Sequence, residues 1–121
     1  MQEAFKLIGE TVSKKNSNKF NAKYKFTYKT KGYVNWYEGA VMQLRPQIKT
    51  KGIDYPVEIS MLFVHGDNRR RDSDNGQTSI LDLLVREGVI VDDNWTIVRR
   101  TVVDNDYEKG NPYCIITIKG L

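Results

Sequence analysis

One stretch in the middle of the chain restricts the possible folds more than any other, and it begins with an alternating apolar run, Val57–Val64. A period of two is typical of a β-strand with one buried face. Polar turn residues follow, and then comes a run with a broad apolar face, Gln77–Glu87, which indicates an amphipathic helix closed by Gly88. The next apolar run, Thr96–Val103, predicts another strand. Strand, helix and strand in this order favour an α/β domain.

The rest of the chain adds elements of the same kinds. Apolar residues at three- and four-residue steps predict a helix from Tyr33 to Gln43, whose aromatic side chains would face the core or a dimer partner. The polar segment Val12–Asn21 predicts a loop. Further strands are predicted at Phe5–Ile8, Tyr24–Tyr28 and Tyr113–Ile118. We therefore expect one small domain of the α/β (α+β) class over residues 1–121, long enough for one modest core.

Charge is divided unevenly along the chain. Residues 1–51 contain 11 Lys or Arg against 3 Asp or Glu, whereas residues 52–121 contain 8 against 12. A basic half joined to an acidic half indicates a protein that binds phosphates with one part and uses carboxylates with the other. Lysines that only solvate the surface are the alternative for the basic half.

Several features favour a cytoplasmic protein without a membrane anchor. No apolar run reaches the ~20 residues that cross a bilayer. The first five residues lack the basic and apolar regions of a signal peptide. Cys114 is the only cysteine, which excludes an intrachain disulfide and suits a reducing compartment. Since no base lies near Cys114 in sequence, we expect a packed side chain rather than a nucleophile.

The densest charge in the chain lies between the central strand and its helix, at Arg69–Asn75, where three arginines precede Asp72 and Asp74. In an extended stretch these two side chains would share one face, with their Cβ atoms roughly 6.5–7 Å apart, and Mg²⁺ could bridge the carboxylates. Asp92 or Asp93, just past the helix, could add a ligand if the chain returns beside the first strand. Such a metal site could hydrolyse a phosphodiester while the arginines hold the flanking phosphates.

The same residues also fit two simpler roles. Acidic side chains interact favourably with helix N-termini by ~0.3–1 kcal/mol, and Asp74 or Asn75 would then be the N-cap. The segment Asp72–Gly76 also looks like the start of a calcium-binding EF-hand loop. That loop needs its glycine at position six and an acid at position twelve, whereas here Gly76 is fifth and Leu83 is twelfth. The calcium site is therefore excluded.

Three further features allow both a structural and a functional interpretation. The polar loop carries lysines and amides that could contact phosphate oxygens or only solvate the loop. Aromatic residues alternate with lysines at Tyr24–Tyr28, a pattern of either a core-facing strand or a base-stacking surface. His65, at the end of the central strand, is expected to be structural rather than catalytic.

The order of these motifs resembles the RusA family of Holliday junction resolvases. The segment Arg71-Asp72-Ser73-Asp74-Asn75, an apolar helix, Gly88 and Asp92-Asp93 follow the family's pattern of an Arg-Asp-x-Asp-Asn segment, a helix and an Asp-Asp pair. Residues 13–17 and 33–44 resemble its basic loop and first helix more loosely. The resemblance implies a mixed β-sheet packed with two main helices.

The resemblance also implies an activity and a set of site residues. It implies a homodimeric, Mg²⁺-dependent endodeoxyribonuclease, with Mn²⁺ as a substitute, that makes paired cuts across four-way DNA junctions in recombination and repair. A two-fold dimer suits the two symmetric strands of a junction. The metal-binding and catalytic carboxylates would be Asp72, Asp74 and Asp93, with Asp92 a weaker candidate. The residues implied to bind DNA are Lys14, Lys15, Asn16, Lys19, Arg69, Arg70 and Arg71.

One position departs from the family's pattern. Thr78 stands where the family commonly has a lysine, four residues after the second aspartate. Because threonine carries no charge, we expect Arg71 or a lysine of the polar loop to replace it, or else catalysis to be weak or lost. The second hypothesis is therefore a protein of this fold that binds branched DNA in a salt-sensitive way without cutting it. A third is an interaction protein that self-associates through its oppositely charged halves.

Overall fold

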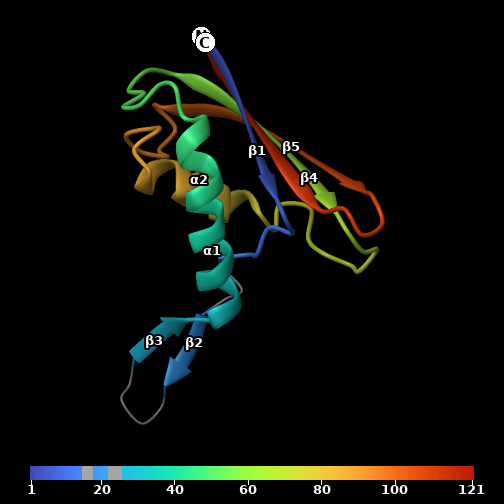
Figure 1. Ribbon diagram of the computed structural model, residues 1–121. Helices are drawn as coiled ribbons and strands as arrows, with labels where there is room; N and C mark the ends of the chain where they lie inside the picture. The colour runs from blue at the N-terminus through green and yellow to red at the C-terminus, as the bar shows by residue number, and fades with distance from the viewer. Residues whose placement is uncertain (15–17, 22–25) are drawn as a thin grey trace.

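A computed structural model describes residues 1–14, 18–21 and 26–121. Four strands form the main sheet in the order β1-β6-β4-β5, in which β4 and β5 run parallel and the other neighbours antiparallel. Strands β2 and β3 pair as a separate hairpin at the N-terminal end of α1 (Figure 1). The elements are β1 Gln2–Ile8, β2 Asn18–Asn21, β3 Phe26–Lys29, α1 Lys31–Leu44, a 3₁₀ turn η1 Arg45–Gln47, β4 Val57–His65, α2 Gln77–Arg86, β5 Val98–Tyr107 and β6 Tyr113–Gly120. The expected α+β arrangement, a mixed sheet with two helices, is confirmed.

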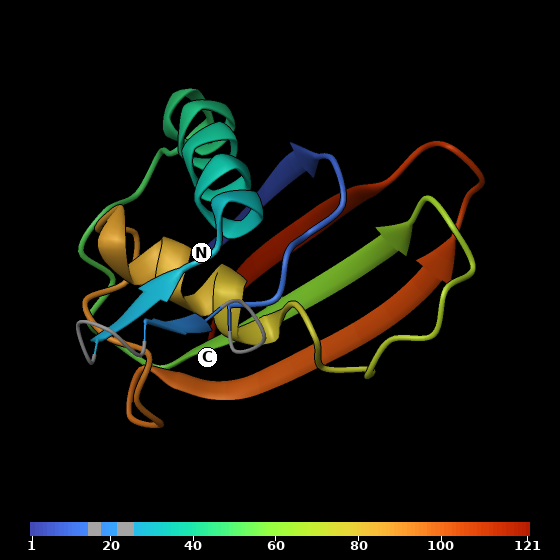
Figure 2. The same cartoon turned by 90° about the horizontal axis from the view of Figure 1, so that it is seen from below.

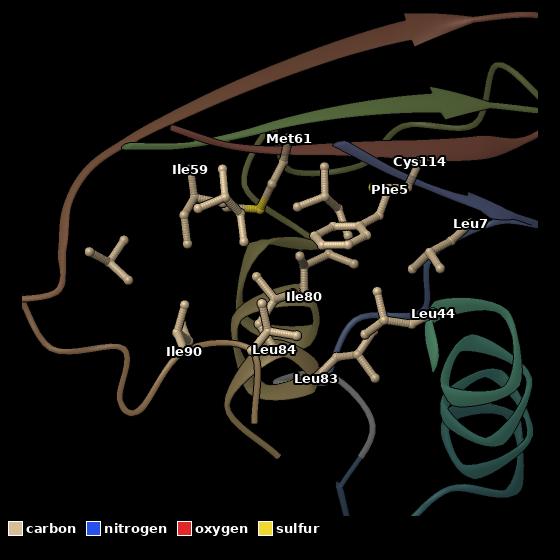
Figure 3. Close-up of a cluster of buried hydrophobic side chains, with 14 of the residues drawn as sticks. Phe5, Leu7, Leu44, Ile59, Met61, Ile80, Leu83, Leu84, Ile90 and Cys114 are labelled. Carbon is tan, nitrogen blue, oxygen red and sulfur yellow. The ribbon is translucent and has the colours of Figure 1, made fainter. Parts of the chain in front are cut away.

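Helices α1 and α2 lie on one face of the main sheet (Figure 2). The core consists of side chains from both helices and from the sheet. In β4 the inward residues alternate with half-buried ones, as the period-two pattern predicts. Met61 and Ile59 point from β4 toward Ile80 and Leu84 of α2, and Cys114 closes the same cluster from β6 (Figure 3). Burial of each large aliphatic side chain contributes about 1.5–3 kcal/mol.

This packing tests two predictions, the role of Cys114 and the role of the aromatic side chains of α1. Cys114 is fully buried, and burial raises the pKa of its thiol to about 12, so it packs as a small apolar residue. On α1, Tyr33 is buried and Trp36 and Tyr37 pack against the core. The aromatic stripe of this helix therefore packs in the core.

Within the described ranges neither helix has the length and apolar character of a membrane span.

The outer edge of β1 is closed by side chains of α1 and of the turn η1 that follows it. Gln43 accepts a hydrogen bond from the N–H of Ile8 at 2.6 Å and donates to the Ile8 carbonyl at 3.0 Å. Gln47 makes the same pair of contacts with Lys6, at 2.9 and 2.8 Å. Two amide groups thus take the place of a neighbouring strand, which fixes α1 against the sheet.

The predicted loop Val12–Asn21 contains a strand, and the predicted strand Thr96–Val103 runs further than expected. Asn18–Asn21 belongs to β2 because it finds a partner in β3, although asparagine has a low strand propensity. Asn105 and its neighbours continue β5 through Tyr107, paired in parallel with the end of β4. The last residues of β5 are exposed on an edge strand, so they carry no apolar signal. The first two residues of the predicted strand Tyr24–Tyr28 lie outside the described residues, and β3 itself is Phe26–Lys29.

The start of α2 also differs from its prediction. Its N-cap is Gly76, which makes no side-chain cap, so the expected cap at Asp74 or Asn75 is wrong. The reason is a turn just before the helix, in which the N–H of Asn75 bonds the carbonyl of Asp72 and the N–H of Gln77 bonds that of Asp74, both at 3.1 Å. Both candidate caps therefore belong to this turn and precede the first residue of the helix.

We expect the substitution Gly76→Ala to destabilise the protein. A Cβ at Gly76 would lie 2.6 Å from Cε1 of Phe63, whose ring is itself buried in the core. Overpacking of this kind costs about 1–3 kcal/mol, which corresponds to a fall of several degrees in Tm in thermal unfolding. The matched control is Gly39→Ala in α1, where nothing lies within 4 Å of the added carbon. An equal Tm for both variants would mean that the contact with Phe63 does not restrict the site.

Candidate active site

The acidic loop, residues 66–76, joins the end of β4 to the start of α2 and carries Asp72 and Asp74. Both aspartates are exposed. The segment from Ser73 to Gly76 is a turn, so the extended geometry on which the bridging argument depended is not present. The turn, rather than a strand pleat, sets the relative direction of the two carboxylates.

A hollow of about 370 Å³ opens beside Asp72, lined by Arg70, Arg71 and Asn75 as well. A water molecule occupies about 30 Å³ in the liquid, so this volume can hold a phosphate group together with a hydrated cation. The Asp72 carboxylate makes no side-chain hydrogen bond or ion pair within the described part of the chain. Two arginines and an uncommitted carboxylate therefore line one open space.

The three arginines have different surroundings. Arg71 is only 12% exposed, and its guanidinium lies 3.0 Å from Asp67 and 3.4 Å from Glu10, so two carboxylates compensate its charge. The hydrogen bond from Arg71, together with the backbone N–H of Arg69, holds the pKa of Asp67 below its usual value. Arg69 is 76% exposed, and Arg70 is exposed on the wall of the hollow. Arg69 and Arg70 are thus the more available cations, and Arg71 mainly braces the loop.

The predicted basic loop after β1 is anchored on α2. The hydroxyl of Ser79, buried in α2, accepts from the N–H of Lys14 at 2.7 Å and donates to the carbonyl of Val12 at 2.6 Å. The ammonium of Lys14 pairs with Asp82 at 2.9 Å. Lys14 therefore already has an acidic partner. Lys15 and Asn16, and the side chain of Lys19, lie outside the described residues.

Asp92 and Asp93 lie at the other end of α2 from the acidic loop. After the helix the chain pairs with the segment before β4, where the N–H of Val91 bonds the carbonyl of Ile53 at 3.0 Å. Asp72 and Asp74 follow the opposite end of β4. The ten residues of α2 span about 15 Å between the two places.

The three predicted metal ligands are consequently not assembled within one chain. Among the described residues no group of three His, Cys, Asp or Glu side chains is close enough to hold a metal ion. Asp92 has a local role instead, since it accepts hydrogen bonds from Asn94 and from the N–H of Asp93, and these lower its pKa. Asp93 is exposed.

Residues that sequence reasoning did not single out also contact the acidic loop. Glu10 accepts from the N–H of Gly66 at 3.2 Å and lies 2.7 Å from Nδ1 of His65. Asn105 donates to the carbonyl of Ser73 at 2.8 Å, and its Oδ1 lies 2.8 Å from Nε2 of His65. His65 does not line the hollow. No local pattern marks Glu10 or Asn105, because each reaches the loop only through the fold of the sheet.

The comparison with protein families agrees with this arrangement. The model of the family described as "Endodeoxyribonuclease RusA" matches residues 9–119, which contain the arginines, the acidic loop and both sets of aspartates. The chain belongs to the RusA family. It is also 34% identical over 92 residues to "Crossover junction endodeoxyribonuclease RusA" of Aquifex aeolicus (strain VF5), a match that covers 76% of this chain and 71% of the relative. The resemblance drawn from the sequence motifs is confirmed, and the RusA family model matches nearly the whole chain.

Proposed function

We propose that this RusA-family chain is an endodeoxyribonuclease that resolves four-way DNA junctions by Mg²⁺-dependent hydrolysis at the acidic loop. The observation that carries the proposal is the hollow lined by Arg70, Arg71 and Asp72, in which the Asp72 carboxylate makes no side-chain hydrogen bond or ion pair within the described part of the chain. This hydrolysis needs two parts, which are cations that hold the phosphodiester and, beside them, a carboxylate that binds a metal ion. The match to an endodeoxyribonuclease family over residues 9–119 supports the proposal.

The acidic loop has a donor set that suits Mg²⁺. This ion is usually held by one or two carboxylates, with waters and substrate phosphates completing its shell. Asp72 and Asp74 are exposed carboxylates two positions apart, and they would hold the ion at the edge of the hollow. Mn²⁺ accepts the same oxygen ligands. The chemistry that the metal supplies when bound is Lewis acidity, which favours attack of water on a phosphodiester.

The remaining residues of the site would bind and orient the DNA backbone. Arg69 and Arg70 are exposed and can pair with phosphate oxygens on either side of the hollow. Asn75 lines the hollow and can contribute an amide contact. Arg71 holds the loop through Asp67 and Glu10, so its charge replaces the missing lysine at Thr78 only in part.

A homodimer would complete the predicted ligand set. Because α2 separates Asp93 from Asp72 and Asp74 in one chain, a site that contains all three carboxylates requires two chains. In a two-fold dimer each surface contacts its symmetric counterpart, which generates two equivalent sites. Two sites match the two strands that must be cut to resolve a junction, so the dimer serves both the ligand set and the substrate.

Cleavage of a labelled synthetic four-way junction, beside a linear duplex of matching sequence, tests the proposed function. We expect paired nicks in the junction alone with Mg²⁺ or Mn²⁺, and none with a chelator. Salt-sensitive binding without nicks would overturn the nuclease and favour a binding protein in which Thr78 marks lost catalysis. Absence of binding even at low salt would overturn both and favour self-association of the charged halves.

A further inference from the structure

A chain of hydrogen bonds connects three separate parts of the fold to the acidic loop. It begins at Glu10, just after β1, continues through His65 at the end of β4 and Asn105 on β5, and ends at the carbonyl of Ser73. The contacts measure 2.7, 2.8 and 2.8 Å in that order. Ser73 is the residue between Asp72 and Asp74. The chain therefore ends on the main chain between the two candidate ligands.

The partners of Asn105 determine which way its amide group points. The Ser73 carbonyl can only accept, so the NH₂ of Asn105 must face it. This leaves Oδ1 of Asn105 toward Nε2 of His65, which must then donate. On the other side of the ring, Nδ1 of His65 lies 2.7 Å from the carboxylate of Glu10.

Reversal of the Asn105 amide would break the arrangement. Its oxygen would then face the oxygen of the Ser73 carbonyl, so two acceptors would oppose each other and the bond to the acidic loop would be lost. His65 contacts Glu10 through Nδ1 and Asn105 through Nε2, and only 17% of its side chain is exposed. His65 and Glu10 thus act on the Ser73 carbonyl only through Asn105.

We propose that Asn105 is a positioning residue for the nuclease, which fixes the main chain between Asp72 and Asp74 through its bond to the Ser73 carbonyl. The inference rests on the proposed function of the acidic loop. Rotation of the peptide group after Ser73 would redirect the carboxylate of Asp74 relative to that of Asp72. The turn bonds at Asn75 and Gln77 hold the loop from within, whereas Asn105 ties it to the sheet.

The isosteric substitution Asn105→Asp tests the direction of this bond. It keeps an oxygen toward His65 but places a second oxygen against the Ser73 carbonyl, so the anchor becomes repulsive. In the metal-free protein we expect the amide protons of Asn75 and Gln77 to exchange with water roughly 2- to 10-fold faster by NMR, the change that one net hydrogen bond corresponds to. Asn105→Ala should show a similar or smaller increase.

The matched control is Asn111→Ala. Asn111 also donates from an exposed amide, to Glu108 at 2.9 Å, so its side-chain bond lies within the turn between β5 and β6 rather than on the acidic loop. In this control variant, amide exchange at Asn75 and Gln77 should equal that of the parent. If Asn105 only supported β5, the isosteric aspartate would be tolerated. Unchanged amide exchange at Asn75 and Gln77 in Asn105→Asp would therefore overturn the inference.

Junction cleavage separates this inference from the proposed function. In Asn105→Asp we expect kcat to fall by roughly 2- to 10-fold with unchanged junction affinity, because the carboxylates are misdirected while the arginines remain. A parent protein that does not cut junctions would overturn the proposed function, and with it the role of Asn105 in positioning the metal ligands. A parent that cuts, beside a variant with unchanged exchange and unchanged kcat, would overturn only the role of Asn105.

Discussion

Asp74→Asn should abolish junction cutting while junction binding persists. The substitution keeps the size of the side chain but removes the charge that a hard cation needs. Metal catalysis is worth several kcal/mol and each 1.36 kcal/mol is tenfold in rate, so we expect nicking to fall by at least about 100-fold. Binding should hold or strengthen slightly, because one negative charge is removed beside DNA phosphates. Nicking rates at saturating Mg²⁺ and gel-shift affinities measure the two effects.

Glu38→Gln provides the control for this result. Glu38 is an exposed carboxylate on α1, so its neutralisation changes the net charge equally without touching the acidic loop. Its nicking rate should match that of the parent. If Asp74→Asn cut junctions as fast as Glu38→Gln, the assignment of the metal site to Asp72 and Asp74 would be wrong.

The second large effect is expected when two inactive variants are mixed. Asp72→Asn and Asp93→Asn should each be inactive alone, but together they should nick junctions. In a mixed dimer with shared sites, one site receives both substitutions and the other receives neither. Random pairing at equal amounts makes about half of the dimers mixed, so roughly a quarter of the parental sites should be active. Each mixed dimer has one intact site, and single rather than paired nicks are expected.

The mixing experiment also has a definite negative outcome. If each site took all its carboxylates from one chain, every site in a mixed dimer would carry one substitution, and the mixture would stay inactive. Subunit exchange is checked by mixing parental protein with Asp72→Asn and following the loss of paired cutting. If both variants are inactive alone, exchange without recovered nicking would show that Asp93 acts within its own chain.

The central elements of the fold could be predicted from the sequence because their side chains have one buried face. Val57–Val64 and Gln77–Glu87 match β4 and α2 to within one residue at each end. Asn18–Asn21 could not be assigned in this way, since its strand depends on a partner rather than on its composition. The end of β5, beyond Val103, was not predicted for a related reason, because an exposed edge strand has no apolar face that would show a period of two.

The candidate site divides in the same way between local and distant residues. Asp72, Asp74 and the arginines are neighbours in sequence, so their charge pattern is visible without a structure. Asn105 lies 32 positions from Ser73 and reaches it only because β5 pairs with β4. The distance between Asp93 and the acidic loop likewise follows from the direction of α2, which sequence spacing alone does not give.

The closed edge of β1 affects how this protein behaves at high concentration. A bare sheet edge offers unpaired N–H and C=O groups on which another chain can add a strand, and that addition can propagate into aggregates. In the second half of β1 the amides of Gln43 and Gln47 already occupy these groups, at Ile8 and Lys6. The opposite edge, β5, carries charged side chains of both signs, and such charges discourage strand addition. The sheet is therefore guarded against polymerisation on both sides, by side-chain amides on one and by charge on the other.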